Sequence, residues 1–466
     1  MAREFMGKDF LLYNEPAVKM FEAAEKMPVF DWHCHLSPKE IYENSEPRDI
    51  AELWLGGDHY KWRVMRSCGI DERLITGDAP GREKFIAFAS CMPSLIGNPM
   101  YHWCHLELRR YFGIDDILNA DTAESIYERA NEKIRAGGFT PRELIAKSDV
   151  VCLCTTDDPV DSLEYHTLLQ KENLPFRVLP AFRPDKALSI DLPSFLPWLS
   201  QAAKVNGREI DSYAELERFL KARIEFFASL GCRASDHGFS YIPYEEAGKD
   251  ELEEIFRAAK SGRAVPEAEA DKFKTALLRF LAKEYAARGW VMELHIGPMR
   301  NNNTRMFNTI GPDTGFDSID DQPVARKLSR FLDSLDREDS LPRTILFTLN
   351  PRDNYVLGSM LGNFQSAGVQ SKIQFGSAWW FNDNIDGMRA QMTALANLGV
   401  LGKFVGMVTD SRSFLSYPRH EYFRRIACNL MGELVESGQY PYDEKALTKL
   451  AEDISYRNAA EYFGIG

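Results

Sequence analysis

The sequence predicts an α/β fold, a (β/α)₈ barrel of the TIM type with helical insertions that cap its C-terminal mouth. Eight short runs rich in β-branched and aromatic residues recur along the 466-residue chain and stop at polar clusters. Most of these runs are continuously apolar, which is typical of parallel strands buried on both faces. Helical patterns separate the runs, and a strand–helix unit repeated eight times favours a barrel.

The eight predicted strands are spread over almost the whole chain. They cover residues 29–35, 149–158, 176–185, 231–240, 290–297, 343–351, 372–381 and 403–412. Apolar residues at helical spacing follow the second strand at 162–172 and precede the fourth, fifth and sixth strands at 213–231, 271–289 and 323–335.

Two long segments interrupt this alternation. Residues 37–148, after the first strand, are rich in helical patterns, and we expect them to form a helical cap over the mouth. The charged segment 244–288, before the fifth strand, is expected to form a pair of helices. No internal repeat or low-complexity tract divides the chain, so residues 1–466 are predicted to form a single domain, as barrels with insertions do.

Composition and charge narrow the classes of partner. The formal net charge is −13 and no run of lysine and arginine is present, which argues against nucleic acid or an anionic membrane as a partner. The N-terminal segment lacks the apolar core of a signal peptide, and no stretch approaches the roughly 18 apolar residues of a membrane span. The eight cysteines lack disulfide-framework or zinc-ribbon spacing, and we expect a cytoplasmic protein.

A His-x-His pattern ends the first predicted strand. His33 and His35 point to the same face because side chains alternate along a strand with period two. Their imidazoles can therefore converge on one divalent cation. The alternative is two ordinary polar residues at a strand end, and the pair alone does not separate these interpretations.

Polar residues at the ends of the other strands favour the metal site. In a TIM barrel the active site lies at the C-terminal ends of the strands. His295 ends the fifth strand and Asp410 the eighth, and together with His33 and His35 they suit a mononuclear site. The remaining polar and aromatic residues at strand ends are Thr155, Thr156, Asp157, Asp158, Arg183, Asp185, Asp236, His237, Asn350, Arg352, Trp379, Trp380 and Arg412.

The motifs resemble those of the amidohydrolase superfamily and, within it, of the uronate isomerase (glucuronate isomerase) family. The resemblance is carried by FDWHCHLSP, GDHYKWRVMR, TTDDPVDSLEYH, AFRPDKAL, SDHGF, LHIGPMRNNNTRMF, GPDTGFDSIDD, GSAWWFND and VTDSRSFLSYPRHEYFRR, in family order from residue 30 to about 425. Thr348-Leu349-Asn350 stands where hydrolases of the superfamily carry a metal-binding histidine, and no lysine ends the fourth strand to bridge two metals. These departures fit isomerisation better than hydrolysis.

The resemblance implies an aldose–ketose isomerase of uronate catabolism. The expected reactions convert D-glucuronate to D-fructuronate and D-galacturonate to D-tagaturonate by proton transfer from C2 to C1 through an enediolate. One divalent ion, expected to be zinc, would be held by His33, His35 and Asp410. His295 is either a further ligand or a hydrogen-bonding partner of the substrate. The expected partners are a small uronate and further copies of the chain in a homo-oligomer.

The resemblance also suggests residues for the proton transfer. Tyr60, in the segment DHYKWRVMR, is a candidate base if a nearby cation lowers the pKa of its phenol, and Arg412 is the cation we expect. The alternative for Tyr60 is an aromatic packing residue of the cap. Asp410 can move the hydroxyl proton during ring opening, and whether Tyr60 or Asp410 takes the C2 proton stays open. Trp379 and Trp380 are expected to pack at the mouth.

The substrate carboxylate calls for an arginine. Arg183 is the expected partner because a guanidinium binds a carboxylate in a bidentate way that a lysine cannot reproduce. The alternative for Arg183 is a salt bridge with Asp185 at the strand end. His59 and Asp236 are further candidates for substrate binding, without a unique role.

Two other functions use the same residues. The first is a metal-dependent hydrolase of an amide or lactone, with Asp410 as the base for an activated water. The missing strand-six histidine and the arginines at the mouth weigh against it. The second is a non-catalytic protein that binds sugar acids. The combination of Asp410, Tyr60 and Arg412 weighs against that interpretation.

Overall fold

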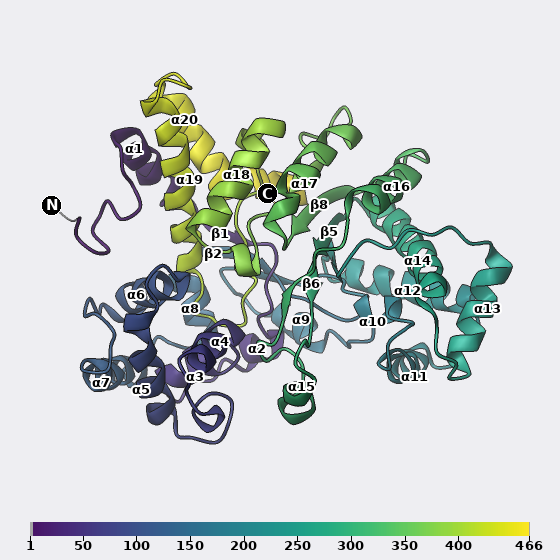
Figure 1. Cartoon of the computed structure of the whole chain (residues 1–466), viewed down its shortest axis with the longest axis horizontal. Coiled ribbons are helices and arrows are strands. Elements are labelled where there is room, and N and C mark those ends of the chain that lie inside the picture. Colours follow the sequence, from purple (N-terminus) through teal and green to yellow (C-terminus); the bar gives the residue numbers. More distant parts are fainter. Residues whose placement is uncertain (1–2, 466) are drawn as a thin grey trace.

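Two sheets of parallel strands lie at the centre of the molecule, and helices surround them (Figure 1). The computed structural model describes residues 3–465. In order across the sheets, the strands are β1 (Val29–Asp31), β2 (Val150–Cys154) and β3 (Arg177–Leu179), and then β4 (Ala234–Phe239), β5 (Val291–Ile296), β8 (Arg343–Thr348) and β9 (Ile373–Phe375). Parallel bridges from Phe182 to Asp157 and to Ser235 join the two sheets. The predicted α/β class is therefore confirmed.

The strands are short and deeply buried. All six residues of β5 are buried, as the apolar run at this position predicts. Its register places Glu293 opposite Asp236 of β4 and opposite Ile345 of β8. Because the strands are parallel, the polar residues at their carboxyl ends are brought to one edge of the sheets.

The eighth predicted strand is not a regular strand in the structure. Residues 403–412 do run beside the chain that follows β1, since Asp410 N donates to His33 O at 3.2 Å and His35 N donates to Ser411 O at 2.9 Å. The backbone of Gly406 and Asp410 has φ values of +77° and +45°, which lie outside the strand region and interrupt the ladder.

The ring of strands is also interrupted between β9 and this segment. Within residues 3–465, no ladder pairs the two, so the sheets do not by themselves show closure into an eight-stranded barrel. One side chain spans the interval, because Gln374 Nε2 donates to Lys403 O at 2.8 Å.

A two-stranded antiparallel arm was not predicted. It consists of β6 (Pro298–Met299) and β7 (Ser318–Ile319), and the segment between them carries helix α15 (Thr304–Ile310). Figure 1 shows α15 projecting from the lower edge of the molecule.

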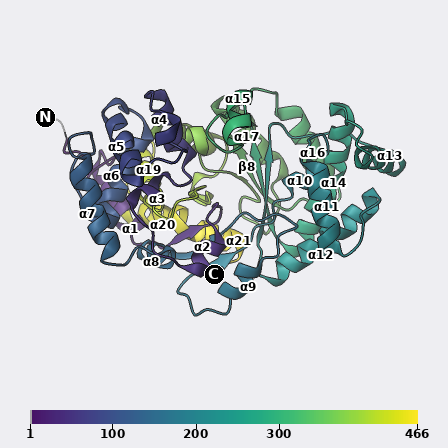
Figure 2. The same ribbon diagram turned by 90° about the horizontal axis from the view of Figure 1, so that it is seen from below.

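The segment between β1 and β2 folds into helices. They are α2 (Pro38–Glu43), α3 (Ile50–Leu55), α4 (His59–Ser67), α5 (Gly81–Cys91), α6 (Pro99–Phe112), α7 (Ala123–Arg135) and α8 (Pro141–Lys147). Polar side chains start several of them, as when Asp58 accepts hydrogen bonds from Tyr60 N and Lys61 N at the beginning of α4. Figure 1 shows α3 to α7 grouped at its lower left, and Figure 2 shows α13 at the opposite end of the molecule.

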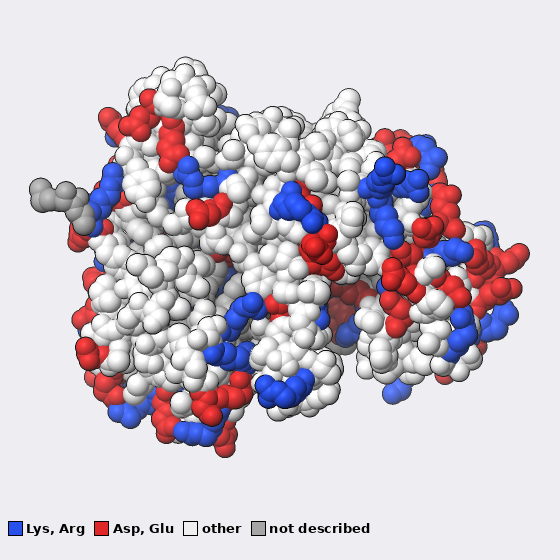
Figure 3. All heavy atoms as spheres, in the orientation of Figure 1, with Lys and Arg blue, Asp and Glu red and all other residues white. Residues whose placement is uncertain are grey.

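The remaining helices lie around the strands. They are α1 (Glu15–Ala24), α9 (Glu164–Leu169), α10 (Asp185–Leu188), α11 (Phe195–Asn206), α12 (Tyr213–Ser229), α13 (Lys249–Lys260), α14 (Glu267–Arg288), α16 (Ala325–Asp336), α17 (Asn354–Leu361), α18 (Ile385–Leu398), α19 (Pro418–Glu436), α20 (Glu444–Glu452) and α21 (Asn458–Phe463). Among residues 3–465, no helix has the length and apolar character needed to cross a membrane. On the face drawn in Figure 3, basic and acidic side chains are interspersed and no continuous basic surface is present.

Candidate active site

Three histidines and three carboxylates meet at the carboxyl ends of the central strands. His33 and His35 follow β1, Glu293 and His295 alternate along β5, and Asp236 lies in β4. Asp410 joins them from the segment beside β1. The residues come from distant parts of the sequence, and the parallel topology brings them together.

His33, His35 and Asp410 form one group of side chains that could hold a metal ion. Asp410 Oδ1 lies 3.2 Å from His33 Nε2 and 3.1 Å from His35 Nε2. The Nδ1 atom of each histidine faces another acceptor, since His33 Nδ1 lies 3.1 Å from Glu293 Oε2 and His35 Nδ1 lies 3.1 Å from Thr156 Oγ1. The Thr156 hydroxyl itself donates to the backbone at 2.7 Å, so its oxygen can accept from His35 Nδ1 when that nitrogen carries the proton.

This hydrogen-bond pattern fits a divalent metal ion. A cation at this place would take the position of the protons that Nε2 of the histidines shares with Asp410, and each imidazole would then keep one proton on Nδ1 and direct an Nε2 lone pair at the cation. Three acceptor atoms then converge within 4.8 Å of one another, and a cation between them would satisfy all three. Glu293 and Thr156 would orient the two histidines, as partners of ligating histidines commonly do.

His295 belongs to a second, deeper group with His33, Asp236 and Glu293. His295 Nδ1 lies 2.8 Å from Asp236 Oδ1, and the imidazole stacks on Phe347 with ring centroids 4.1 Å apart. Among the described residues, His295 Nε2 has no hydrogen-bond partner, although the side chain lines the cavity at this edge. This placement leaves His295 available to a substrate.

The charges of the site suit metal binding. Burial opposes ionisation of Asp410, but its hydrogen bonds to His33 and His35 hold the pKa of the carboxyl well below its ordinary value. Burial lowers the pKa of His35 to about 4, which keeps this imidazole neutral. Burial also disfavours a charged His33, but Asp236, Asp410 and Glu293 outweigh it and raise the pKa of His33 well above 6.5. The carboxylates thus favour positive charge at this position.

A cavity of about 620 Å³ opens onto this group. Its walls combine His33, His35, His59, His295 and Asp410 with the cationic side chains of Arg183, Lys186, Arg300 and Arg412, and with Trp379 and Trp380. The arginines at the wall make the cavity suitable for a small anion. Because the chain as a whole is acidic, an anion site in it needs such locally placed arginines.

Arg183 lines the cavity, and two of its three nitrogens have carboxylate partners. Its Nε lies 2.8 Å from Asp185 Oδ2 and its Nη1 lies 2.9 Å from Asp236 Oδ2. The third nitrogen lies against Gly238, where an added Cβ would be only 3.0 Å from Nη2. The salt bridge with Asp185 is therefore present in the structure. Arg412 and Arg300 are freer, because within residues 3–465 each has only Asp313 as a carboxylate neighbour, at 3.9 and 3.5 Å.

Tyr60 lies beside the cavity and not among its lining residues. It lines a neighbouring cavity of about 460 Å³ and stacks on His59 with ring centroids 4.8 Å apart. The cation over its ring is Arg419, 5.5 Å from the centroid. Burial raises the pKa of Tyr60 well above 10, and Asp410 adds to this rise. Arg412, the cation expected to lower this pKa, is not among the main influences on it, and Arg419 lowers it without overcoming burial.

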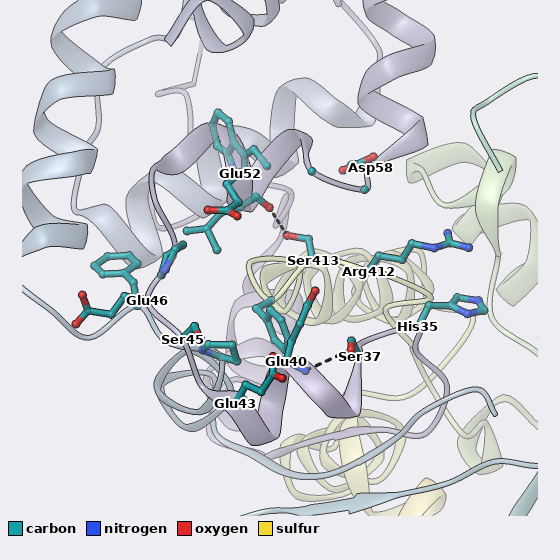
Figure 4. Close-up of a pocket in the computed structure, with 18 residues that line it drawn as sticks. His35, Ser37, Glu40, Glu43, Ser45, Glu46, Glu52, Asp58, Arg412 and Ser413 are labelled. Atoms are coloured by element: carbon teal, nitrogen blue, oxygen red, sulfur yellow. Dashed lines mark hydrogen bonds between the residues drawn. The ribbon is translucent and has the colours of Figure 1, made fainter. Parts of the chain in front are cut away.

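A second hollow of about 500 Å³ shares His35 and Arg412 with the first cavity. Figure 4 shows these two side chains at one end of it and Glu46 toward the other. Glu40, Glu43, Glu46 and Glu52 make its wall acidic, so an anion would favour the arginine-lined cavity instead.

Sequence reasoning missed two side chains at the site. Glu293 is fully buried next to His33, and its signal was a lone carboxylate in an apolar strand, two residues before His295 and therefore on the same face. Trp379 was expected only to pack, but its Nε1 donates to Asp410 Oδ2 at 2.8 Å.

Comparison with known proteins gives consistent results over the full length. The model of the glucuronate isomerase family matches residues 2–463. A uronate isomerase of Caldanaerobacter subterraneus subsp. tengcongensis is 56% identical over 99% of this chain and 100% of its own length. A uronate isomerase of Caldicellulosiruptor bescii is 55% identical with the same coverage. The crystal structure of the uronate isomerase of Thermotoga maritima has a TM-score of 0.94 at 33% identity, over 99% of this chain and 100% of that one.

Proposed function

The chain belongs to the glucuronate isomerase family and catalyses the isomerisation of hexuronates, and we propose that His33, His35 and Asp410 hold one divalent metal ion at its active site. The convergence of two imidazole nitrogens and a carboxylate oxygen at the cavity carries this proposal. The nitrogen and oxygen donors are compatible with zinc, the ion expected from the sequence. Full-length matches to uronate isomerases do not favour the alternative of an amide or lactone hydrolase.

The proposed reaction moves a proton from C2 to C1 of an aldose uronate. The bound ion would supply fixed positive charge that stabilises the oxyanion of the enediolate. Asp410 is ionised and lines the cavity, so it can accept a substrate proton. Tyr60 is less suited to this step, because burial raises its pKa and its ring faces the neighbouring cavity. We therefore prefer Asp410 to Tyr60 as the base.

Arg412 and Arg300 are the better-supported partners of the substrate carboxylate. Both line the cavity, and in the part of the chain that the structure describes neither has a carboxylate closer than 3.5 Å. Two of the three guanidinium nitrogens of Arg183 already face Asp185 and Asp236, which leaves fewer of its donors for the substrate. In this proposal Arg183 holds those two carboxylates, while His59 and His295 provide imidazoles at the wall for sugar hydroxyls.

We also propose that the strands close into the barrel predicted from the sequence. The parallel bridges of Phe182 and the hydrogen bonds between residues 403–412 and the chain after β1 support a continuous ring. All eight cysteines are free thiols, which supports a location in a reducing cytoplasm.

The function is tested by assaying zinc-loaded protein on D-glucuronate and D-galacturonate, with lactones and N-acyl amino acids as controls. Ketose should form from the uronates, and the controls should remain intact. His33→Ala should lower zinc content and turnover together, because it removes one proposed ligand. Hydrolysis of a control compound without ketose formation would refute the isomerase.

A further inference from the structure

Asp410 has a backbone conformation that residues with a side chain rarely adopt. Its φ of +45° lies in the left-handed region, where Cβ crowds the backbone. Such conformations persist when the surrounding structure enforces them, and they concentrate at functional sites. In this conformation the carboxylate lies within 3.2 Å of His33 Nε2 and His35 Nε2, so the alignment of the site depends on it.

Asp31 holds the residue that precedes Asp410. Its Oδ1 accepts a hydrogen bond from Thr409 N at 2.8 Å, and its Oδ2 accepts one from Thr409 Oγ1 at 2.5 Å. Asp31 ends β1 and is fully buried, so water does not compete for either bond. Hydrogen bonds to a buried carboxylate are strong and fix the geometry of their donors.

Arg419 holds the same residue at its carbonyl. Arg419 Nη1 donates to Thr409 O at 3.0 Å, and the side chain is 2% exposed in helix α19. Thr409 is thus bonded at its amide, its hydroxyl and its carbonyl. The carbonyl and the Asp410 amide share one peptide plane, and that amide donates to His33 O at 3.2 Å. The contacts with Arg419 and with His33 O therefore fix the orientation of this peptide plane.

Asp31 and Arg419 are not among the described residues that line the cavity, so they would act on it through Thr409. We propose that Asp31, acting through Thr409 and supported by Arg419, is a positioning residue that keeps the Asp410 carboxylate aimed at His33 and His35. The inference rests on the proposed function, since that function makes Asp410 a metal ligand.

The test compares zinc affinities, measured by competition with a chromogenic chelator, among full-length variants. Thr409→Val removes the hydroxyl but keeps the β-branched shape, and it should weaken zinc binding by about 10- to 100-fold, as loss of outer partners of a ligand typically does. Thr409→Ser restores the hydroxyl and should bind zinc like the wild type. Thr344→Val is the matched control, because Thr344 is fully buried on β8 and its hydroxyl, among the described residues, bonds only Pro342 O, at 2.9 Å.

Variants of Asp31 test the same proposal without changing Thr409. The amide of Asp31→Asn can accept from Thr409 N and donate to Thr409 Oγ1, so zinc affinity should be nearly retained. Asp31→Leu removes both bonds, and its folded fraction should lose at least as much affinity as Thr409→Val.

The Asp410→Asn variant distinguishes failure of the proposed metal site from failure of the positioning role of Asp31. If Asp410→Asn binds zinc as tightly as the wild type, the proposed metal set fails. If Asp410→Asn weakens binding but Thr409→Val does not, the positioning role alone is overturned. An equal loss in Thr409→Val and Thr344→Val would also overturn it, because it would reflect general destabilisation.

Discussion

Asp410 makes the contacts on which the site most depends. One carboxylate oxygen faces His33 and His35, and the other accepts a hydrogen bond from Trp379. The hydrogen bonds with the two histidines lower its pKa far enough to overcome burial, so it is charged at neutral pH. The pKa of Tyr60 shifts in the opposite direction, because burial and the charge of Asp410 both raise it.

The two candidate bases should therefore respond differently to removal of one functional group. Asp410→Asn should lower turnover by about 10²- to 10⁴-fold, the typical loss when a general base is removed. Tyr60→Phe keeps the stacking on His59 and should retain turnover close to that of the wild type. Both are checked by steady-state kinetics at saturating zinc. A hundredfold loss in Tyr60→Phe would restore the phenol as the base.

The two cavity arginines should also differ. Arg412→Met should raise the Michaelis constant more than it lowers turnover, because it removes a free partner of the substrate carboxylate. Arg183→Met should instead lower the unfolding midpoint, because it leaves Asp236 and Asp185 without their counterion. Kinetics and thermal unfolding of both variants check this. A stable Arg183→Met enzyme with a raised Michaelis constant would support Arg183 as the substrate clamp.

At the scale of elements, the predictable features are those encoded locally. Continuous apolar runs predicted strands such as β5, and the polar residues that end them predicted His33, His35 and Asp410 at one edge. The irregular 403–412 segment could not be foreseen, because the bonds that hold Thr409, next to the left-handed Asp410, come from Asp31, 378 positions away in the sequence. The contact between Tyr60 and Arg419 could not be predicted either, since it joins residues that are far apart in the sequence.

Helix α4 offers a test of how one element is anchored. Asp58 accepts hydrogen bonds from the backbone at the start of the helix and pairs with Lys61 Nζ at 2.5 Å. Lys61 is 1% exposed, so Asp58→Ala would bury an unpaired charge as well as remove a cap. We expect a loss of about 3–5 kcal/mol in the free energy of unfolding, measured with urea.

Asp443→Ala is the control for this prediction. Asp443 caps helix α20 by accepting from Ala446 N, and it pairs with no buried lysine among the described residues. Loss of this cap should cost about 1 kcal/mol. Equal losses in the two variants would mean that the Lys61 pair contributes nothing beyond capping.

At the scale of the whole molecule, the metal group joins parts of the chain that are far apart. The proposed ligands follow β1 and precede α19, and Glu293 supports them from β5. Such a ligand set exists only in the folded state, so a bound ion stabilises the fold through its binding free energy.

Metal removal should therefore lower the thermal unfolding midpoint of the wild type. At a free zinc concentration a hundred times the dissociation constant, the stabilisation is about 2.7 kcal/mol. Scanning calorimetry with and without a chelator measures the difference, and Asp410→Asn should show much less of it. A midpoint that does not change on chelation of the wild type would contradict a folded-state metal site.

The most direct test of the central claim is the fate of hydrogen at C2 and C1. Zinc-loaded protein is incubated with D-glucuronate in D₂O, and the product is followed by NMR. A protein base that moves a proton exchanges it with solvent, so we predict ketose that carries deuterium at C1. Absence of ketose, or ketose that keeps all of a C2 label in H₂O, would contradict isomerisation by proton transfer at this site.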